Sequence, residues 1–173
     1  NTGGINADFG CTITNCSVRE STLNGISVGT AGTITNCSLQ NNLGDGINAG
    51  SGSTITNCSV SVSLDGIEVS SDCTVRGNTC TFNGAQGDGS GIHVTGTNNR
   101  IEGNSCTNAD RGIGVDAAGN IIIRNTCSGN TLNWNVVAGN VILVVNATTA
   151  GVVSGNTGGT APGSTDPSVN FTY

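Results

Sequence analysis

The sequence reads CTITNCSV at residues 11–18, GTITNCSL at 32–39 and STITNCSV at 53–60, so one motif returns every 21 positions. Looser copies stand at 73–80, 99–106 and 120–127. The equivalent apolar positions of the six copies are Ile13, Ile34, Ile55, Val75, Ile101 and Ile122. A fixed period of this length is typical of proteins in which each repeat stacks on the next.

A second motif runs in phase with the first and reads GISV at 25–28, GINA at 46–49, GIEV at 66–69, GIHV at 91–94 and GIGV at 112–115. The series starts with GINA at 4–7 and ends in a degraded copy around Trp134 and Val136. Both motifs alternate apolar and polar residues with a period of two, which predicts short β-strands.

A bend interrupts each copy of the first motif at a residue that tolerates a left-handed backbone. These bend residues are Asn15, Asn36, Asn57, Gly77 and Gly103. Arg124 occupies the position in the last copy. Arginine does not favour this conformation, so we expect the last coils to bend differently.

Short strands repeated in register predict an all-β, single-stranded, right-handed parallel β-helix of about seven coils of about 21 residues. Composition agrees, since the chain has no Lys and no Met and only 9% charged residues. The repeats place the β-helix at residues 1–156. Residues 157–173 are expected to form a C-terminal tail that caps the helix or adds a strand.

The unit N-x-I-x-G-N-x-C followed by G-I-x-V resembles the right-handed parallel β-helix repeat of the pectin-lyase-like superfamily, over about residues 4–156. The closing segment GSTDPSVNFTY at 163–173 is similar to that of secreted bacterial members. The resemblance implies the fold strongly but the function weakly, because the superfamily holds lyases, hydrolases, adhesins and tailspikes. It also implies that a lyase would use a Ca²⁺-binding Asp cluster with an Arg or Lys base. The chain has no Lys, and no Arg falls beside Asp45 or Asp65, which counts against a lyase.

Stacking turns positions of the repeat into columns, and two inward columns contain cysteine. One column runs through Cys16, Cys37, Cys58, Asn78, Asn104 and Asn125, and the other through Val18, Leu39, Val60, Cys80, Cys106 and Cys127. We interpret the thiols as small buried hydrophobic groups and the Asn run as a ladder of amides bonded along the stack.

The best acid–base candidates lie around the second motif. Asp45 and Asp65 precede its glycine in successive coils, so they are expected to be neighbours and are the candidate Ca²⁺ ligands. Glu68 and His93 share the next outward column, and with Asp65 they form the candidate catalytic group. The alternative is structural, because Asp-Gly favours turns and a His beside a Glu is commonly a surface pair. Apart from Ca²⁺, no cofactor is expected.

An outward array of threonines is the candidate binding face. It consists of Thr12, Thr14, Thr33, Thr35, Thr54 and Thr56. A flat array of this kind fits a glycan- or ice-binding face, and the alternative is ordinary solvated strand surface, where Thr is favoured.

The ends of the repeat are candidates for assembly. The first coil starts in mid-repeat at Gly4 and Ile5, while Val169, Phe171 and Tyr173 alternate as a terminal strand does. Either a cap precedes the first coil, or the open end meets another copy, and unlike ends that meet head to tail generate a filament. In that arrangement, the terminal strand is expected to complete the coil of a neighbour.

Charge and composition limit the partners. Eleven acidic residues against five Arg give a net charge of −6, which is expected to repel a polyanion such as DNA, since nucleic-acid binders are rich in clustered cations. No apolar run reaches the roughly 20 residues of a membrane span. The eight Cys and the lack of Lys indicate an exported protein, extracellular or at the cell surface.

These features together predict a non-enzymatic extracellular structural β-solenoid that associates with itself or with surface polysaccharide. Two alternatives stay open. One is a fragment of a polysaccharide lyase or glycoside hydrolase acting on acidic polysaccharide, and the other is a passive glycan- or ice-binding module.

Overall fold

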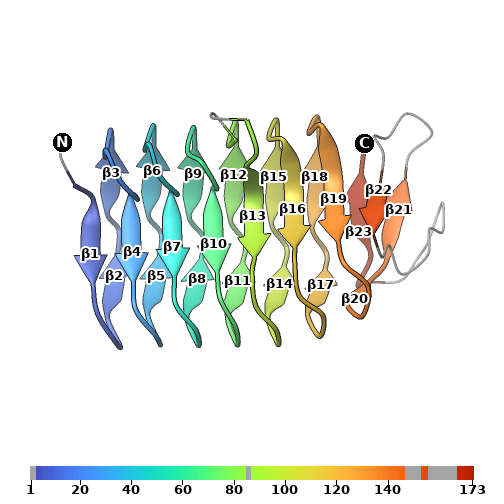
Figure 1. The fold of residues 1–173 in the computed structure, drawn as a ribbon, viewed down its shortest axis with the longest axis horizontal. Coiled ribbons are helices and arrows are strands. Elements are labelled where there is room, and N and C mark those ends of the chain that lie inside the picture. The colour runs from blue at the N-terminus through green and yellow to red at the C-terminus, as the bar shows by residue number, and fades with distance from the viewer. Residues whose placement is uncertain (1–2, 85–86, 147–152, 156–166) are drawn as a thin grey trace.

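The computed structural model describes residues 3–84, 87–146, 153–155 and 167–173, and every helix or strand assigned within them is a β-strand. The strands pair in parallel and form three sheets that wind around one axis (Figure 1). The chain is therefore a parallel β-helix, as the repeats predict.

Sheet A has the spatial order β1 (Ile5–Ala7), β4 (Ile26–Val28), β7 (Ile47–Ala49), β10 (Ile67–Val69), β13 (Ser90–Val94), β16 (Arg111–Val115), β19 (Leu132–Val136) and β22 (Val153–Gly155). Sheet B has the order β2 (Thr12–Thr14), β5 (Thr33–Thr35), β8 (Thr54–Thr56), β11 (Thr74–Arg76), β14 (Arg100–Glu102), β17 (Ile121–Ile123) and β20 (Val141–Ile142). Sheet C has the order β3 (Ser17–Arg19), β6 (Ser38–Gln40), β9 (Ser59–Ser61), β12 (Thr79–Thr81), β15 (Ser105–Thr107), β18 (Thr126–Ser128), β23 (Asn170–Thr172) and β21 (Val144–Asn146).

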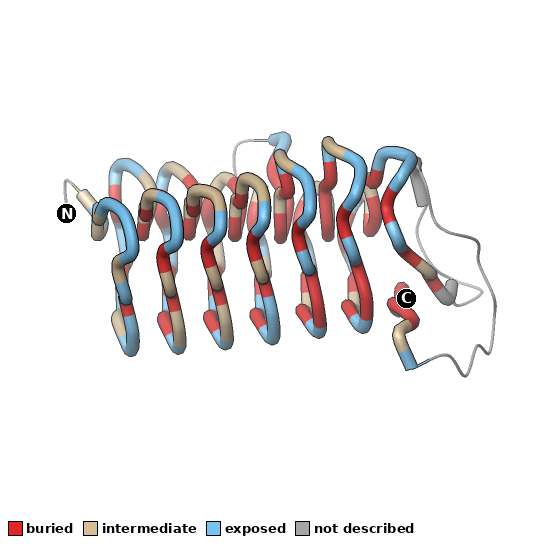
Figure 2. Tube along the Cα trace, turned by 90° about the horizontal axis from the view of Figure 1, so that it is seen from below, coloured by how far each residue is buried: buried red, intermediate tan, exposed pale blue. Residues whose placement is uncertain are grey.

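The register confirms the predicted columns. Ile13 pairs with Ile34 and Ile34 with Ile55, so residues 21 positions apart lie directly over one another. The strands make about six turns in this way. Burial alternates along each coil, and the inward columns form one continuous apolar core (Figure 2). The predicted degraded copy is part of this core, because Trp134 continues the Ile113 column and is fully buried.

The bend between sheets B and C has the predicted left-handed backbone, with φ between 55° and 56° at Asn15, Asn36 and Asn57. The expectation that the last coils bend differently was wrong, because Arg124 has φ 60° and makes the same bend. Its side chain explains this, since Nη1 donates to Oε1 of Glu102 at 2.7 Å and Nε donates to the carbonyl of Pro167 at 2.9 Å. These bonds offset the cost of a left-handed arginine.

A second bend, between sheets C and A, also has a left-handed backbone, which the sequence did not indicate. Val62 has φ 54° and Phe82 has φ 53°, although bulky side chains disfavour this region. Each backbone N–H still donates to the next coil, to Thr81 O at 3.3 Å and to Thr107 O at 3.0 Å. The regular stacking of neighbouring coils therefore overrides the local preference.

The glycine of the second motif is required by the close approach of successive coils. An added Cβ at Gly66 would lie 2.4 Å from the carbonyl oxygen of Gly91, and one at Gly112 would lie 2.5 Å from the carbonyl oxygen of Asn133. Any larger residue must push the coils apart, which explains why the motif keeps Gly before its first apolar residue.

The predicted amide ladder is present and continues beyond the repeats. Nδ2 of Asn78 donates to Oδ1 of Asn104 at 3.0 Å, Asn104 bonds Asn125 in the same way, and Asn125 bonds Asn170, again at 3.0 Å. The repeat does not predict Asn170, which lies 45 positions after Asn125. All eight cysteines are free thiols. The members Cys37, Cys58, Cys80, Cys106 and Cys127 of the two predicted columns are buried, whereas Cys16 is half-buried.

The C-terminal strand β23 inserts between β18 and β21 of its own sheet. Its alternating residues predict that this strand completes the coil of a neighbouring copy, but it pairs within its own chain instead. Asn170 and Thr172 point inward, while Phe171 and Tyr173 are exposed and Val169 is buried. At the opposite end, Gly4 and the half-buried Ile5 line a pocket together with Leu23, Asn24 and Ser27 of the next coil.

Candidate functional site

The predicted acid–base residues meet on the outer face of sheet A. Glu68 of β10 pairs with Asn48 of β7 on one side and with His93 of β13 on the other, so all three point outward in one column. Asp65 precedes β10 by two positions. Asp65, Glu68 and His93 each offer an atom within 4.8 Å of the other two, so the structure brings together the group that the sequence singled out.

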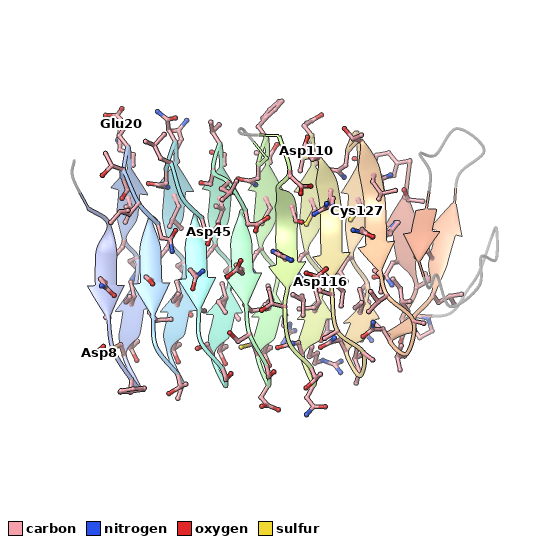
Figure 3. The ribbon with its side chains drawn as sticks, in the orientation of Figure 1. Asp8, Glu20, Asp45, Asp110, Asp116 and Cys127 are labelled. Carbon is pink, nitrogen blue, oxygen red and sulfur yellow. The ribbon has the colours of Figure 1, made fainter. Side chains whose placement is uncertain are left out.

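His93 is held by three carboxylates. Its Nδ1 lies 2.9 Å from Oδ2 of Asp65 and 3.5 Å from Oε2 of Glu68, while its Nε2 lies 2.9 Å from Oδ2 of Asp116. Asp116 directly follows β16 and is labelled with Asp45 in Figure 3. The repeat does not predict Asp116, because this residue stands just beyond the last position of the second motif.

The contacts decide the charge of His93. The hydrogen bond to Asp65, and next the one to Glu68, raise the pKa of His93 to about 11 against the opposing effect of burial. The same pairing lowers the pKa of Glu68 below its usual value. Near neutral pH, His93 is therefore an imidazolium that donates through both ring nitrogens, and it has no lone pair with which to take a proton.

Asp45 and Asp65 are neighbours on successive coils, as predicted, and both bond to backbone. Oδ1 of Asp45 accepts the N–H of Asp65 at 3.3 Å, and Oδ1 of Asp65 accepts the N–H of Ser90 at 2.5 Å. Asn24 begins the same series, because its Oδ1 accepts the N–H of Asp45 at 2.9 Å. Both carboxylates are buried, and desolvation raises the pKa of Asp45.

These carboxylates are a poor fit for Ca²⁺, which takes six to eight oxygen ligands. The second oxygen of Asp45 accepts Nδ2 of Asn48 at 2.9 Å, and the second oxygen of Asp65 faces the His93 imidazolium. The residues that were candidates for metal binding therefore already have partners. The imidazolium of His93 is the cation that Asp65 and Glu68 bind in this structure.

Val75 and Ile101 are 26 positions apart instead of 21, so the loop before β13 carries an insertion, and this loop contacts an arginine at the edge of the face. Asp88, in the loop before β13, lies 2.5 Å through Oδ1 from Nη2 of Arg111. The same loop is tied to the next coil, because the N–H of Gly89 donates to Oδ2 of Asp110 at 3.1 Å. Arg111 pairs in register with Ser90, whose backbone N–H bonds Asp65 from the next coil.

The threonine array lies on another face, on the outer side of sheet B. Thr12, Thr33 and Thr54 stack in one column, and Thr14, Thr35 and Thr56 in the other. Thr35 and Thr56 bond through their Oγ1 atoms at 2.9 Å. The six candidate binding residues are therefore contiguous with one another and separate from the cluster on sheet A.

Comparisons with known proteins agree with the fold. Residues 3–157 match a family described as the right handed beta helix region, which agrees with the predicted handedness. No curated protein matches the chain. Among the residues that the structure describes, no helix has the length and apolar character that a membrane crossing needs.

Two solved structures are similar to this chain. The first is pectate lyase Pel9A, with 17% identity and a TM-score of 0.67 over 91% of this chain and 51% of that one. The second is the A-module of the mannuronan C-5 epimerase AlgE6 of Azotobacter vinelandii, with 15% identity and a TM-score of 0.59 over 80% of this chain and 54% of that one. The chain thus spans about half the length of these structures, and at such identities the likeness is one of fold.

Proposed function

The chain belongs to the right-handed β-helix family, and on that premise we propose that it serves as a non-enzymatic, extracellular structural β-solenoid. The polar cluster on sheet A is then a device that holds coils together. The observation that carries this proposal is the state of His93, whose two ring nitrogens both bind carboxylates.

Catalysis of proton transfer needs a group whose pKa lies near the working pH and whose reacting atom is accessible. His93 meets neither condition, because its pKa is about 11 and both nitrogens are engaged. One carboxylate oxygen of Asp65 accepts the backbone N–H of Ser90 in the next coil, and the other oxygen is bonded to His93. Both candidate carboxylates therefore face the candidate base, and His93 is engaged by them and by Asp116.

The same contacts explain a structural role. Asp65 precedes β10, His93 lies in β13 and Asp116 follows β16, so the chain of contacts joins three successive coils. It does so at the coil that carries the insertion before β13. We infer that the cluster staples this irregular coil to its two regular neighbours.

An enzyme acting on acidic polysaccharide is the second candidate. The observation that favours it is the gathering of Asp65, Glu68 and His93 on one face of a fold that is similar to a pectate lyase and a mannuronan epimerase. These neighbours are named for activities on polysaccharides, which also supports the extracellular placement in the proposal.

Activity assays separate the two candidates. The protein is incubated with polygalacturonate and with polymannuronate, with added Ca²⁺ or with a chelator, and cleavage and epimerisation are followed. We expect neither reaction. Activity that the exposed control Asp72→Asn retains and Asp65→Asn loses would overturn the structural proposal and establish the enzyme.

A further inference from the structure

Three of the five arginines of this acidic chain gather on the outer side of sheet B. Arg76 ends β11, Arg100 begins β14, and Arg124 directly follows β17. All three are exposed. Within the strands of sheet B, Glu102 is the one acidic residue. We call Arg76, Arg100, Glu102 and Arg124 the arginine patch. It carries a net positive charge in a chain whose net charge is −6.

Glu102 fixes the side chains of two arginines of the patch. Its side chain is 11% exposed, and each of its oxygens takes one arginine: Oε2 lies 2.8 Å from Nε of Arg100 and Oε1 lies 2.7 Å from Nη1 of Arg124. Arg76 pairs with Glu102 across the adjacent strands. The hydrogen bond from Arg100 holds the pKa of Glu102 below its usual value, so this carboxylate stays charged. The arrangement fixes two guanidinium groups and leaves other N–H donors at the surface.

The patch continues the threonine array without a break. Arg100 pairs with Thr74, and Arg76 pairs with Thr56, so the arginines take over the two outward threonine columns. Along the axis, a ligand would therefore meet rows of hydroxyls spaced by one coil, about 4.8 Å apart, and then the guanidinium groups. Hydroxyls of this kind bond sugar hydroxyls, and guanidinium groups bond carboxylates.

The charge of the rest of the chain limits the ligand. A nucleic acid strand carries a charge about every 3.4 Å and would meet the remaining acidic surface, which repels it. A carboxylated glycan has sparser charges along an extended chain, so a few acidic groups can reach the arginine patch while neutral hydroxyls cross the threonines. The patch already binds one carboxylate, that of Glu102, through two arginines.

We propose that the outer side of sheet B, from the threonine array to the arginine patch, is a binding site for an extended carboxylated glycan. The site is independent of the cluster on sheet A. It gives the solenoid a way to attach to an acidic polysaccharide matrix without chemistry on it.

The test measures binding of fluorescent oligogalacturonate by anisotropy at low ionic strength, with a neutral glucan of equal length and a single-stranded oligonucleotide for comparison. The variants are Arg100→Ala and Arg76→Ala/Arg100→Ala. The matched control is Arg19→Ala, which removes an exposed arginine of sheet C that makes no ion pair among the described residues. Circular dichroism checks that each variant is folded.

We expect oligogalacturonate to bind and the neutral glucan not to bind. Arg100→Ala should weaken binding about tenfold, since a charge-assisted hydrogen bond is worth about this factor, and the double variant should abolish it. Arg19→Ala should change the affinity less than twofold. Equal losses in Arg19→Ala and Arg100→Ala, tighter binding of the oligonucleotide, or no binding of oligogalacturonate would each overturn the proposal.

Discussion

Replacing His93 by Gln removes the cation on which three carboxylates converge, and the structure gives the scale of the loss. His93 makes two charge-assisted contacts of 2.9 Å. The side chain of Asp65 is 10% exposed, so its contact with His93 contributes about 2 kcal/mol to stability. The side chain of Asp116 is 59% exposed, so solvent screens its contact with His93 and lowers that contribution to below about 1 kcal/mol. We expect the free energy of unfolding to fall by about 2–3 kcal/mol, which lowers Tm by about 5–10 °C for a chain of this size.

The pH dependence of this effect has a definite sign. The folded-state pKa of His93, about 11, lies above its unfolded value of 6.5. Its contribution is therefore fully present below about pH 6.5 and is lost as the pH rises toward about 11. The difference in Tm between the wild type and His93→Gln should be largest near about pH 6 and should shrink by about pH 10.

Thermal unfolding followed by circular dichroism at several pH values measures this difference. Arg19→Gln serves as the control, because it removes an exposed charge of sheet C outside the cluster and should leave Tm unchanged. A His93→Gln variant that melts within about 1 °C of the wild type at pH 6, or a difference that grows toward pH 10, would refute the assignment of a structural staple.

Three further predictions concern the fold and its association. Gly66→Ala should lower the free energy of unfolding by at least about 2 kcal/mol in chemical denaturation, because its Cβ would lie 2.4 Å from Gly91 O, while Gly103→Asn, at φ 65° with open space around it, should change it little. Asn104→Ala should cost about 2–3 kcal/mol, since it removes the Oδ1 that accepts both the backbone N–H and one Nδ2 N–H of the buried Asn78, and wild-type stability in this variant would contradict the ladder. Head-to-tail association remains a prediction, and electron microscopy should show filaments, whereas short rods of uniform length would contradict it.

The sequence predicts the columns well because the side-chain period of a strand is two and a slip of one residue would turn every apolar side chain outward. Only one register of the strands stacks Ile13, Ile34 and Ile55 inside the core. The same register places Cys58 over Asn78 and Glu68 beside His93. The candidate site could be predicted to this extent.

Features that depend on stacking alone leave no mark in local sequence. Val62 has a left-handed backbone because the coils on both sides fix its hydrogen bonds, and its own preference opposes it. Asn170 completes the amide ladder although the period is broken before it, so column arithmetic cannot reach it. Asp116 joins His93 from a position just beyond the motif, where the repeat sets no expectation.

The protonation state of His93 tests the account most directly, and His93 is the only histidine in the chain. An NMR titration of its imidazole carbon-bound protons reports this state without interference from other residues. We predict that the imidazole stays protonated from about pH 5 to about pH 9, in line with a pKa of about 11. A midpoint near about 6.5 would show an imidazole that the carboxylates do not hold, free to act as a base.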